Sequence, residues 1–562
     1  MWDLIFFANE FLPTVALYHL PFSYRDDFFT QVLTSYNRAY NQQPHSVITN
    51  RMEALLSSMD SAYASGNVYA KPNAAIFHQL MKHYGQIRIR AMARKADALL
   101  QRMDAETSTH GMHAGAIPIA GSTACTDGGV DDVETLSTTS KAMVTTAETI
   151  RLVMWAYARV KRSAPSALRC ESLLERMEAA EAEGNLHLAP DTEAYNVCLR
   201  AFLNASSGGG TGAALKEDFP SRVDNILHRM ENRQKEGHSD VAPNTMTYNL
   251  AIAIFSVSGE KEDHKRALHL LRLLENESLK REGERISSSI GPPSTFAYNA
   301  FLQSVLTHVE EKEQVDYLEK VYNNMVTHND SKPDYTTFDT LFGILSKAGA
   351  TIDLKDGGER AEALFSRMEI QYATGNDVVK PDTKMYTNVI RCWANSRGKY
   401  LASRSHAILS KMERQASLGN KDLQPTLASY AAVINACSNT TELEEQPAAL
   451  QIAFDCYNKV ISLGFPPDAV TYSCLLNCCA SLLHDPKQRK ELAQQVFDAA
   501  CEQGQVNRAV EFSLRRVSPS LYKMYQAQEN KEGHSARARR ANFQEKGLTR
   551  KQRWSSSKLS NT

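Results

Sequence analysis

Apolar residues recur along most of the chain at the spacing of one helix face. In some segments they follow a tyrosine, as in Tyr195, Leu199 and Phe202. In others, two adjacent apolar residues precede a methionine, as in Leu173-Leu174 before Met177. Residues three and four positions apart lie on the same side of an α-helix. Because the two kinds of segment alternate, the pattern predicts paired amphipathic helices.

Glycine and proline separate these predicted helices at a fixed spacing. A glycine lies seven residues after each of five methionines, and a proline lies thirteen residues after the same methionine. The methionines are Met59, Met177, Met230, Met368 and Met412. Gly ends a helix readily because it adopts the left-handed backbone conformation, and Pro is common where a helix begins. The spacing therefore predicts a row of helix-loop-helix units.

One phrase opens most of these units. Pro190-Asp191 leads to Tyr195-Asn196, and the phrase returns at 243–249 and 293–299, with looser copies at 333–339, 381–387, 425–431 and 467–473. The steps between them are 40 to 53 residues. Self-similarity at such a period is typical of repeat architectures. We expect an all-α fold, an α-solenoid of about nine helix-turn-helix hairpins from 26 to 504, and a closing helix over 507–525 that Pro519 interrupts.

Several segments fall outside the rhythm of the repeats. Residues 1–25 are apolar but broken by Glu10 and Pro13, and we interpret them as an N-terminal segment, with a partial repeat as the open alternative. The Gly-, Ser- and Thr-rich insert 107–141 and the basic tail 526–562 are predicted to be disordered. Shorter inserts at 204–219 and 351–358 widen the loops of two hairpins. The repeat array itself is expected to span 26–525.

Composition is that of a folded protein without a strong charge bias. The 562 residues are 43% apolar and 23% charged, with a formal net charge of −1. The tail carries nine Lys/Arg against three Glu, so the rest of the chain is slightly acidic at 54 minus 61, or −7. The ten cysteines include no CxxC pair, which argues against a metal site or a disulfide framework. We expect no cofactor, no membrane partner and buried free thiols.

The repeated phrases resemble the pentatricopeptide repeat family. The shared features are a Tyr-Asn pair in the first helix, an apolar-aromatic-x-x-Met pattern in the second, and Pro-Asp before the next unit. The unit 295–334 comes closest, with Tyr298-Asn299, Val321-Tyr322 before Met325, and Pro333-Asp334. The resemblance covers 190–470 well and 26–190 weakly. These units depart from the family in their length, because they run from 40 residues upward.

The resemblance implies a right-handed solenoid that binds single-stranded RNA at one base per repeat. The residue after the tyrosine and the last residue of the same repeat would read the base together. The implied pairs are Thr30 with Asn73 for adenine, Asn196 with Asn244 for a pyrimidine, Asn249 with Ser294 for cytosine, and Asn299 with Asp334 for uracil. Asp339 with Asp382, Thr387 with Thr426, and Ala431 with Asp468 match the family's pairs poorly or not at all, and Ser473 has no identifiable partner. Base-sandwiching residues would be Met246, Phe296 and Val470, whereas Glu193 and Lys384 depart from that pattern, and His78 and Arg151 fall outside the reading pattern.

Other interpretations of these residues stay open. Asn or Asp near a helix start is commonly only a cap. A tetratricopeptide-like scaffold for other proteins is the competing binding function, and the acidic body favours it. Lys or Arg along the groove of the first helices would favour RNA instead. His308-Val309-Glu310 matches half of a zinc deaminase motif but lacks the downstream cysteines, so we expect no catalysis.

The function that we expect is sequence-selective binding of single-stranded RNA. The protein would act by occupancy in organellar RNA processing, stability or translation, and as a monomer. Residence in a mitochondrion or plastid is implied by the resemblance alone, because no targeting segment is readable in residues 1–25.

Overall fold

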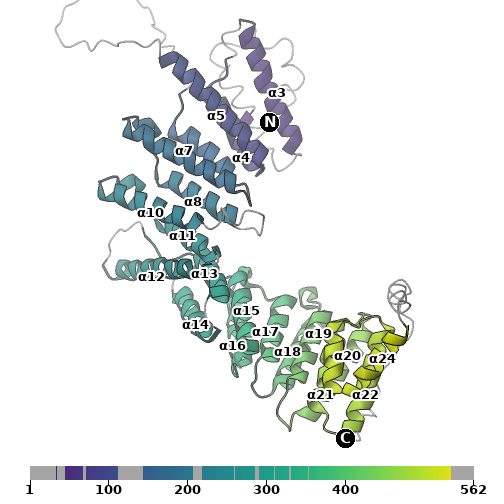
Figure 1. Cartoon of the computed structure of the whole chain (residues 1–562). Helices are drawn as coiled ribbons and strands as arrows, with labels where there is room; N and C mark the ends of the chain where they lie inside the picture. Colours follow the sequence, from purple (N-terminus) through teal and green to yellow (C-terminus); the bar gives the residue numbers. More distant parts are fainter. Residues whose placement is uncertain are drawn as a thin grey trace, which may run out of the picture. The chain divides into compact units, whose positions relative to one another are not determined.

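The computed structural model describes residues 33–34, 45–66, 71–111, 144–206, 218–258, 260–284, 290–308, 311–327, 331–351 and 354–532. Every regular element in these ranges is an α-helix or a short 3₁₀ turn (Figure 1). This confirms the all-α prediction. Segment 1–25, Thr30, most of the insert 107–141, the Gly208–Gly210 triplet and the tail after Glu532 lie outside the described residues.

The chain divides into two compact units, Met1–Pro292 and Pro293–Thr562. The described part of the first unit contains one helix followed by four helix pairs. In order, they are α3 (His45–Ala64), α4 (Ala74–Gln86) with α5 (Arg90–Gly111), α6 (Ala147–Ala158) with α7 (Ala164–Ala182), α8 (Thr192–Ser206) with α10 (Phe219–Lys235), and α11 (Thr245–Val257) with α12 (Lys261–Glu284).

The described part of the second unit contains six helix pairs. They are α13 (Thr295–His308) with α14 (Glu311–Thr327), α15 (Tyr335–Thr351) with α16 (Gly357–Ala373), α17 (Thr383–Asn395) with α18 (Leu401–Ser417), α19 (Leu427–Ser438) with α20 (Gln446–Ser462), α21 (Ala469–Leu482) with α22 (Pro486–Glu502), and α23 (Arg508–Val517) with α24 (Pro519–Glu532). Nine described pairs therefore run from Ala74 to Glu502, with α3 before them, whereas the sequence predicted about nine hairpins over 26–504.

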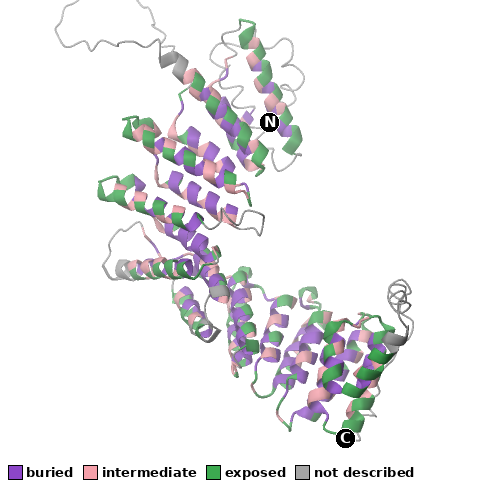
Figure 2. Ribbon diagram, viewed as in Figure 1, coloured by how far each residue is buried: buried purple, intermediate pink, exposed green. Residues whose placement is uncertain are grey.

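Within each unit the first helices of successive pairs pack against one another. In the first unit α4 packs on α6, α6 on α8, and α8 on α11; in the second, α13, α15, α17, α19, α21 and α23 follow in the same way. Each first helix also packs against its own second helix. Buried residues lie between the helices, and exposed residues line their outer sides (Figure 2). The first helices therefore form a continuous row in each unit.

The tyrosine of each repeated phrase belongs to the core. Tyr195, Tyr298, Tyr430 and Tyr472 are among the largest fully buried side chains. Their hydroxyls still need partners, because a buried polar group without a hydrogen bond is costly. Tyr430 donates to Glu413 at 2.6 Å, and Tyr386 donates to Glu369 at 2.8 Å. In both cases the acceptor directly follows the methionine of the preceding second helix.

The predicted glycine stops are present in the structure. Gly66, Gly184, Gly237, Gly375 and Gly419 have φ angles between 93° and 103°. This backbone conformation is open to glycine and strained for other residues. After four of these glycines a 3₁₀ turn follows: Leu186–Leu188, Ser239–Val241, Asp377–Val379 and Lys421–Leu423. Those turns lengthen the exit link, and they contribute to the unusual length of the units.

Three predicted boundaries differ from the structure. Helix α5 continues to Gly111, so the insert begins later than residue 107, because the helical spacing of apolar residues had ended before the helix did. The closing segment 507–525 is two helices and not one, since Pro519 occupies the first position of α24. Helix α24 then continues to Glu532, beyond the expected start of the tail at 526.

Ion pairs join successive second helices along their outer faces. Arg102 of α5 contacts Asp60 of α3 at 2.6 Å, and Arg404 of α18 contacts Glu362 of α16 at 2.9 Å. Further pairs of this kind are Arg169 with Asp97, Arg176 with Asp104, Arg222 with Glu171, Arg229 with Glu178, and Lys411 with Glu369. Exposed pairs contribute little stability singly. Their consequence here is that many acidic groups of the slightly acidic body face basic partners on the second helices.

Candidate nucleic-acid interface

Each first helix begins after a residue that we number position 0. The side chains of Asn73, Asn244, Ser294, Asp334, Asp382 and Asp468 accept hydrogen bonds from backbone N–H groups of their own helices. Thr426 forms a capping box with Ser429. These are the residues expected to end each repeat, so all seven of them act as helix caps. Capping is compatible with base contact only where further polar atoms of the cap stay available.

Position 2 of the first helices is exposed. It is occupied by three of the expected sandwiching residues, and Met246 is 44% exposed, Phe296 49% and Val470 56%. These large apolar side chains therefore keep a substantial part of their surface open to solvent. Glu193 and Lys384 hold the same exposed position in α8 and α17. The row therefore offers some flat apolar contacts and some charged ones.

Position 5 meets position 0 of the following repeat in two of the predicted pairs. In the second unit, Nδ2 of Asn299 donates to Oδ1 of Asp334 at 2.9 Å. In the first unit, Nδ2 of Asn196 donates to Oδ1 of Asn244 at 3.4 Å. These two pairs, assigned to uracil and to a pyrimidine, thus consist of side chains in direct contact.

A buried hydroxyl at position 3 of the following helix completes each pair. Thr337 donates to Oδ1 of Asn299 at 2.7 Å, and Thr247 donates to Oδ1 of Asn196 at 2.8 Å. Both threonines are completely buried. The same contact links Thr149 with His78 at 2.7 Å, and Ser429 with Thr387 at 2.8 Å. Sequence reasoning missed this hydroxyl, although Thr or Ser before the aromatic residue of the phrase was a readable signal.

The backbone fixes which end of each reading amide is the donor. The N–H of Thr337 can only donate, so it holds Oδ1 of Asp334 as an acceptor at 2.8 Å. Oδ1 of Asp334 in turn requires the Nδ2 group of Asn299, which leaves Oδ1 of Asn299 for the Thr337 hydroxyl. A rotation of the amide by 180° would set Oδ1 of Asn299 against Oδ1 of Asp334 and lose the bond between the two side chains. The helix N-terminus therefore orients the residue that faces the groove.

The two bonded pairs offer different atoms to a ligand. The Asp334 carboxylate accepts from the Asn299 side chain and from the Thr337 N–H through Oδ1, and Oδ2 makes no bond with another described residue. In Asn244 the capping atom is again Oδ1, which leaves the Nδ2 group without a partner among the described residues. The Asn299–Asp334 pair therefore presents a donor and an acceptor, whereas the Asn196–Asn244 pair presents donors.

The predicted pair of Asp339 with Asp382 is arranged differently. Asp339 binds Lys384 at 2.7 Å and Asn388 at 2.9 Å, while Asp382 accepts from the hydroxyl of Tyr335 at 2.9 Å. The pKa of Tyr335 is raised, mainly by burial of its hydroxyl and also by the hydrogen bond to Asp382. Asp339 and Asp382 thus bind other partners, and no hydrogen bond joins them.

Some predicted reading residues are turned away from solvent. Asn249 and Thr387 are each 5% exposed. Thr387 donates to the backbone oxygen of Thr383 at 2.7 Å. Ala431 is also buried, and the Ser473 hydroxyl donates to the backbone oxygen of Val470 at 3.0 Å. Asn249, Thr387 and Ala431 therefore offer little accessible surface to a base.

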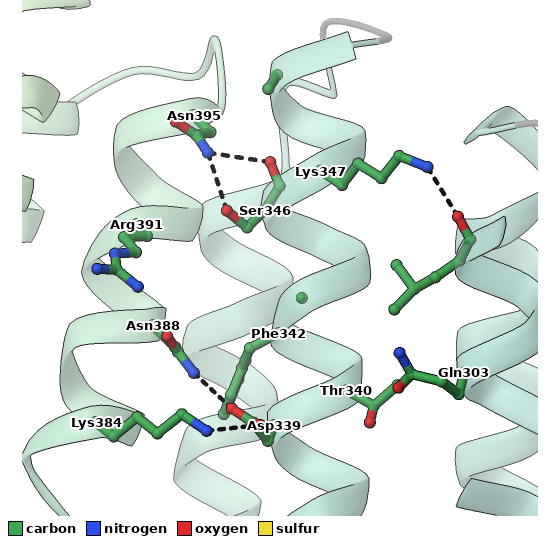
Figure 3. A pocket seen from close by; sticks show the side chains of 13 residues that line it. Gln303, Asp339, Thr340, Phe342, Ser346, Lys347, Lys384, Asn388, Arg391 and Asn395 are labelled. Atoms are coloured by element: carbon green, nitrogen blue, oxygen red, sulfur yellow. Dashed lines mark hydrogen bonds and ion pairs between the residues drawn. The ribbon is translucent and has the colours of Figure 1, made fainter. Parts of the chain in front are cut away.

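A groove crosses three first helices of the second unit. It is lined from α13 by Gln303, from α15 by Asp339 and Lys347, and from α17 by Lys384 and Arg391 (Figure 3). Lys347 donates to the backbone oxygen of Leu306 at 2.8 Å, and Asn395 bonds Ser346 at 2.9 Å. Arg391 makes no hydrogen bond or ion pair with another described residue and is exposed. The groove therefore holds at least one available positive charge.

Arg391 belongs to a recurring basic position. Position 9 of the first helices is basic in α4, α8, α17 and α23, as Lys82, Arg200, Arg391 and Arg516. These side chains lie one to two turns beyond positions 2 and 5 on the same side of the helix. Since Lys and Arg on the groove were the feature expected to separate RNA from protein ligands, their presence favours RNA.

Comparison with known proteins gives only distant structural matches. No model of a known protein family matches the chain, and no curated protein matches its sequence. Solved structures similar to it include the pentatricopeptide repeat protein PPR10 in complex with an 18-nt psaJ RNA element, at 18% identity and a TM-score of 0.30, covering 94% of this chain and 71% of that chain. Yeast Rmd9p in complex with a 16-nt target RNA is similar at 10% identity and a TM-score of 0.32, covering 91% and 96%. At these scores the similarity transfers no function to this chain.

Groups suited to catalysis do not gather among the described residues. No three His, Cys, Asp or Glu side chains there are placed to hold a metal ion. Eight of the nine described cysteines are buried, and burial raises the pKa of the Cys474 thiol to about 11 and that of Cys479 to about 12. His308 ends α13, while Glu310 lies outside the described part of the chain. None of the described helices is long and apolar enough to cross a membrane.

Proposed function

We propose that the chain binds single-stranded RNA sequence-selectively and acts by occupancy. The observation that carries the proposal is the contact between Asn299 and Asp334, two polar side chains from successive repeats, beside the exposed ring of Phe296. Such a group combines the two elements of single-strand recognition, an apolar surface for the face of a base and polar atoms for its edge.

The Asn299–Asp334 pair keeps polar atoms available for the edge of a base, and helix capping alone would not need these atoms. Capping uses only Oδ1 of Asp334, so Oδ2 can accept a hydrogen bond while the second N–H of Asn299 donates one. Uracil offers an N3–H donor between two carbonyl acceptors, which complements this pair. The Asn196–Asn244 pair offers N–H donors, which suit the acceptor atoms of a pyrimidine. The difference between the pairs gives the binding its sequence preference.

Charge supports RNA over a protein ligand. The basic residues at position 9 lie beside the reading positions, where a phosphate backbone needs positive charge. Acidic groups are numerous, but many of them pair with Arg or Lys on the second helices. The slightly negative net charge of the body therefore does not represent the charge of the face formed by the first helices.

In vitro selection from a random single-stranded RNA pool tests the proposal. We expect the full-length chain to enrich RNAs that share a set of fixed bases. The double variant Asn299→Ser with Asp334→Asn should then change the preferred base at one position and leave the others in place. A pool without enrichment would contradict the RNA proposal and leave a protein scaffold as the alternative.

A matched double variant controls for nonspecific effects of these substitutions. Asn420→Ser with Asp422→Asn makes the same chemical changes on the exit link between α18 and α19, away from positions 0 and 5. We expect its selected RNAs to be those of the unaltered chain. Equal shifts in both double variants would show that the Asn299–Asp334 pair does not read a base. The part that the protein plays in processing, stability or translation, and its residence in an organelle, stay predictions.

A further inference from the structure

Helix α23 occupies the place of a first helix, although its sequence lacks the repeated phrase. It packs against α21, the first helix of the preceding pair. Oδ1 of Asn507 accepts from the backbone N–H groups of Ala509 at 3.0 Å and Val510 at 3.1 Å, so Asn507 is its position 0. The row of first helices in the second unit therefore continues one helix beyond the last recognisable repeat.

Position 5 of α23 is an aromatic side chain. Phe512 is 70% exposed, while Val510, Ser513, Leu514 and Val517 of the same helix are buried. A phenylalanine this exposed is unusual in a helix that buries its other apolar residues so completely. Phe512 is therefore at the same helix position as Asn299 in α13 and Ser473 in α21, five residues after position 0.

Arginines surround Phe512 on the exposed side of α23. Arg508 precedes it by four residues, and Arg515 and Arg516 follow it by three and four, so all three flank the ring on one helix face. All three are exposed, and none makes a hydrogen bond or ion pair with another described residue. An aromatic ring between available positive charges is the arrangement that single-stranded nucleic acids meet in proteins that bind them without base preference.

We propose that α23 is an end platform on which one more base of the bound RNA stacks against Phe512, with adjacent phosphates on Arg515 and Arg516. The inference rests on the proposed function, since it assigns one more nucleotide to the same ligand. A phenyl ring carries no hydrogen-bonding group, and every base has a π-face, so this contact adds affinity without selecting a base. It differs in this from the Asn299–Asp334 pair.

Charge complementarity favours RNA as the occupant of this surface. The chain's own tail is a poor candidate, because residues 526–562 carry nine Lys/Arg against three Glu and would be repelled by three arginines. A nucleic acid satisfies the arginines and the ring together. An acidic protein segment is the alternative that the experiment separates.

The experiment measures equilibrium binding of the full-length chain to the RNA of highest affinity from the selection above, and to the same RNA shortened by one nucleotide at either end. Phe512→Ala should weaken binding of the full RNA by about 5- to 100-fold, the range measured for removing one base–aromatic stack. Phe512→Trp should bind within about twofold of the unaltered chain. Against the RNA shortened at the end that meets α23, Phe512→Ala and the unaltered chain should bind equally.

Controls separate this inference from the proposed function. Leu418→Ala removes an equally exposed apolar side chain from the end of α18, and it should leave affinity unchanged. Replacing the base at the terminal position with each of the other three should alter affinity only slightly. Unchanged binding of Phe512→Ala to the full RNA would overturn the platform while leaving RNA binding intact. A strong preference for one terminal base would also overturn it.

Discussion

The amide of the reading residue Asn299 is held by two neighbouring side chains. Asn299 is bonded at its Nδ2 atom by Asp334 and at its Oδ1 atom by Thr337. Thr337 is buried and belongs to the next repeat, so the base preference of one unit depends on a residue of another. Such a residue positions the reading amide without touching the ligand.

Substitution of Thr337 tests this positioning role. Thr337→Val keeps the shape of the side chain but removes the donor to Asn299, so the amide loses one of the two bonds that orient it. We expect selectivity for the base at that position to fall about fivefold, as the loss of a hydrogen bond worth about 1 kcal/mol implies. The readout is the ratio of dissociation constants for RNAs that differ at that base alone.

Thr337→Ser is the matched control, because it keeps the hydroxyl and loses only a methyl group. Its base selectivity should equal that of the unaltered chain. If Thr337→Val and Thr337→Ser lowered selectivity equally, packing and not the hydrogen bond would orient Asn299.

At the scale of helices, the sequence was informative where local chemistry decides the structure. The positive φ angles of Gly184 and Gly375 follow from the demands of a helix end, and they were readable from spacing alone. Helix α23 was not recognised as a first helix, because packing on α21 and not a local motif places it there. The pairing of Asn299 with Asp334 as base-reading residues was implied by the family resemblance, whereas their direct hydrogen bond and the burial of Thr387 were not foreseen.

Two glycines of the second unit should respond oppositely to the same substitution. Gly375 has φ +97°, and Gly343 lies inside helix α15; a Cβ atom at either would meet nothing within 4 Å. Gly375→Ala should therefore destabilise the fold by about 1–2 kcal/mol through backbone strain alone. Gly343→Ala should stabilise it by about 0.5–1 kcal/mol, since Ala is the better helix former.

Thermal unfolding followed by circular dichroism checks this pair of substitutions. The midpoint should fall for Gly375→Ala and rise for Gly343→Ala. A fall of equal size for both would mean that crowding of the new methyl group, and not the left-handed backbone at Gly375, sets the cost.

Over the whole molecule, positive and negative charges are nearly equal in number but lie on different parts of the chain. Acidic residues pair with basic ones along the second helices, and position 9 of several first helices stays basic. Beyond α24, residues 533–562 carry eight Lys/Arg against one Glu. A net charge of −1 conceals this distribution, so bulk composition could not identify the ligand.

Removal of residues 533–562 tests whether their charge contributes to binding. The truncation leaves α24 whole, because that helix ends at Glu532. We expect weaker binding by a similar factor for all RNA sequences, together with a shallower dependence of the dissociation constant on salt. A salt dependence as steep as that of the full chain would exclude an electrostatic role for these residues.

The central claim is that successive first helices of a unit present their position 5 side chains to successive nucleotides. Ala431 offers the most direct test, because it is the position 5 residue of α19. The following helix already supplies an aspartate at position 0, Asp468, and a buried threonine at position 3, Thr471. Asp334 and Thr337 hold these two positions beside Asn299. Ala431→Asn would complete that group three units after Asn299. Selection of RNA with this variant, beside Ala448→Asn on the exposed side of the second helix α20 as the control, should reveal a new preference for uracil three nucleotides from the base read by Asn299. If the Ala431→Asn variant folded but showed no new base preference, or showed one at any other spacing, the account would be contradicted.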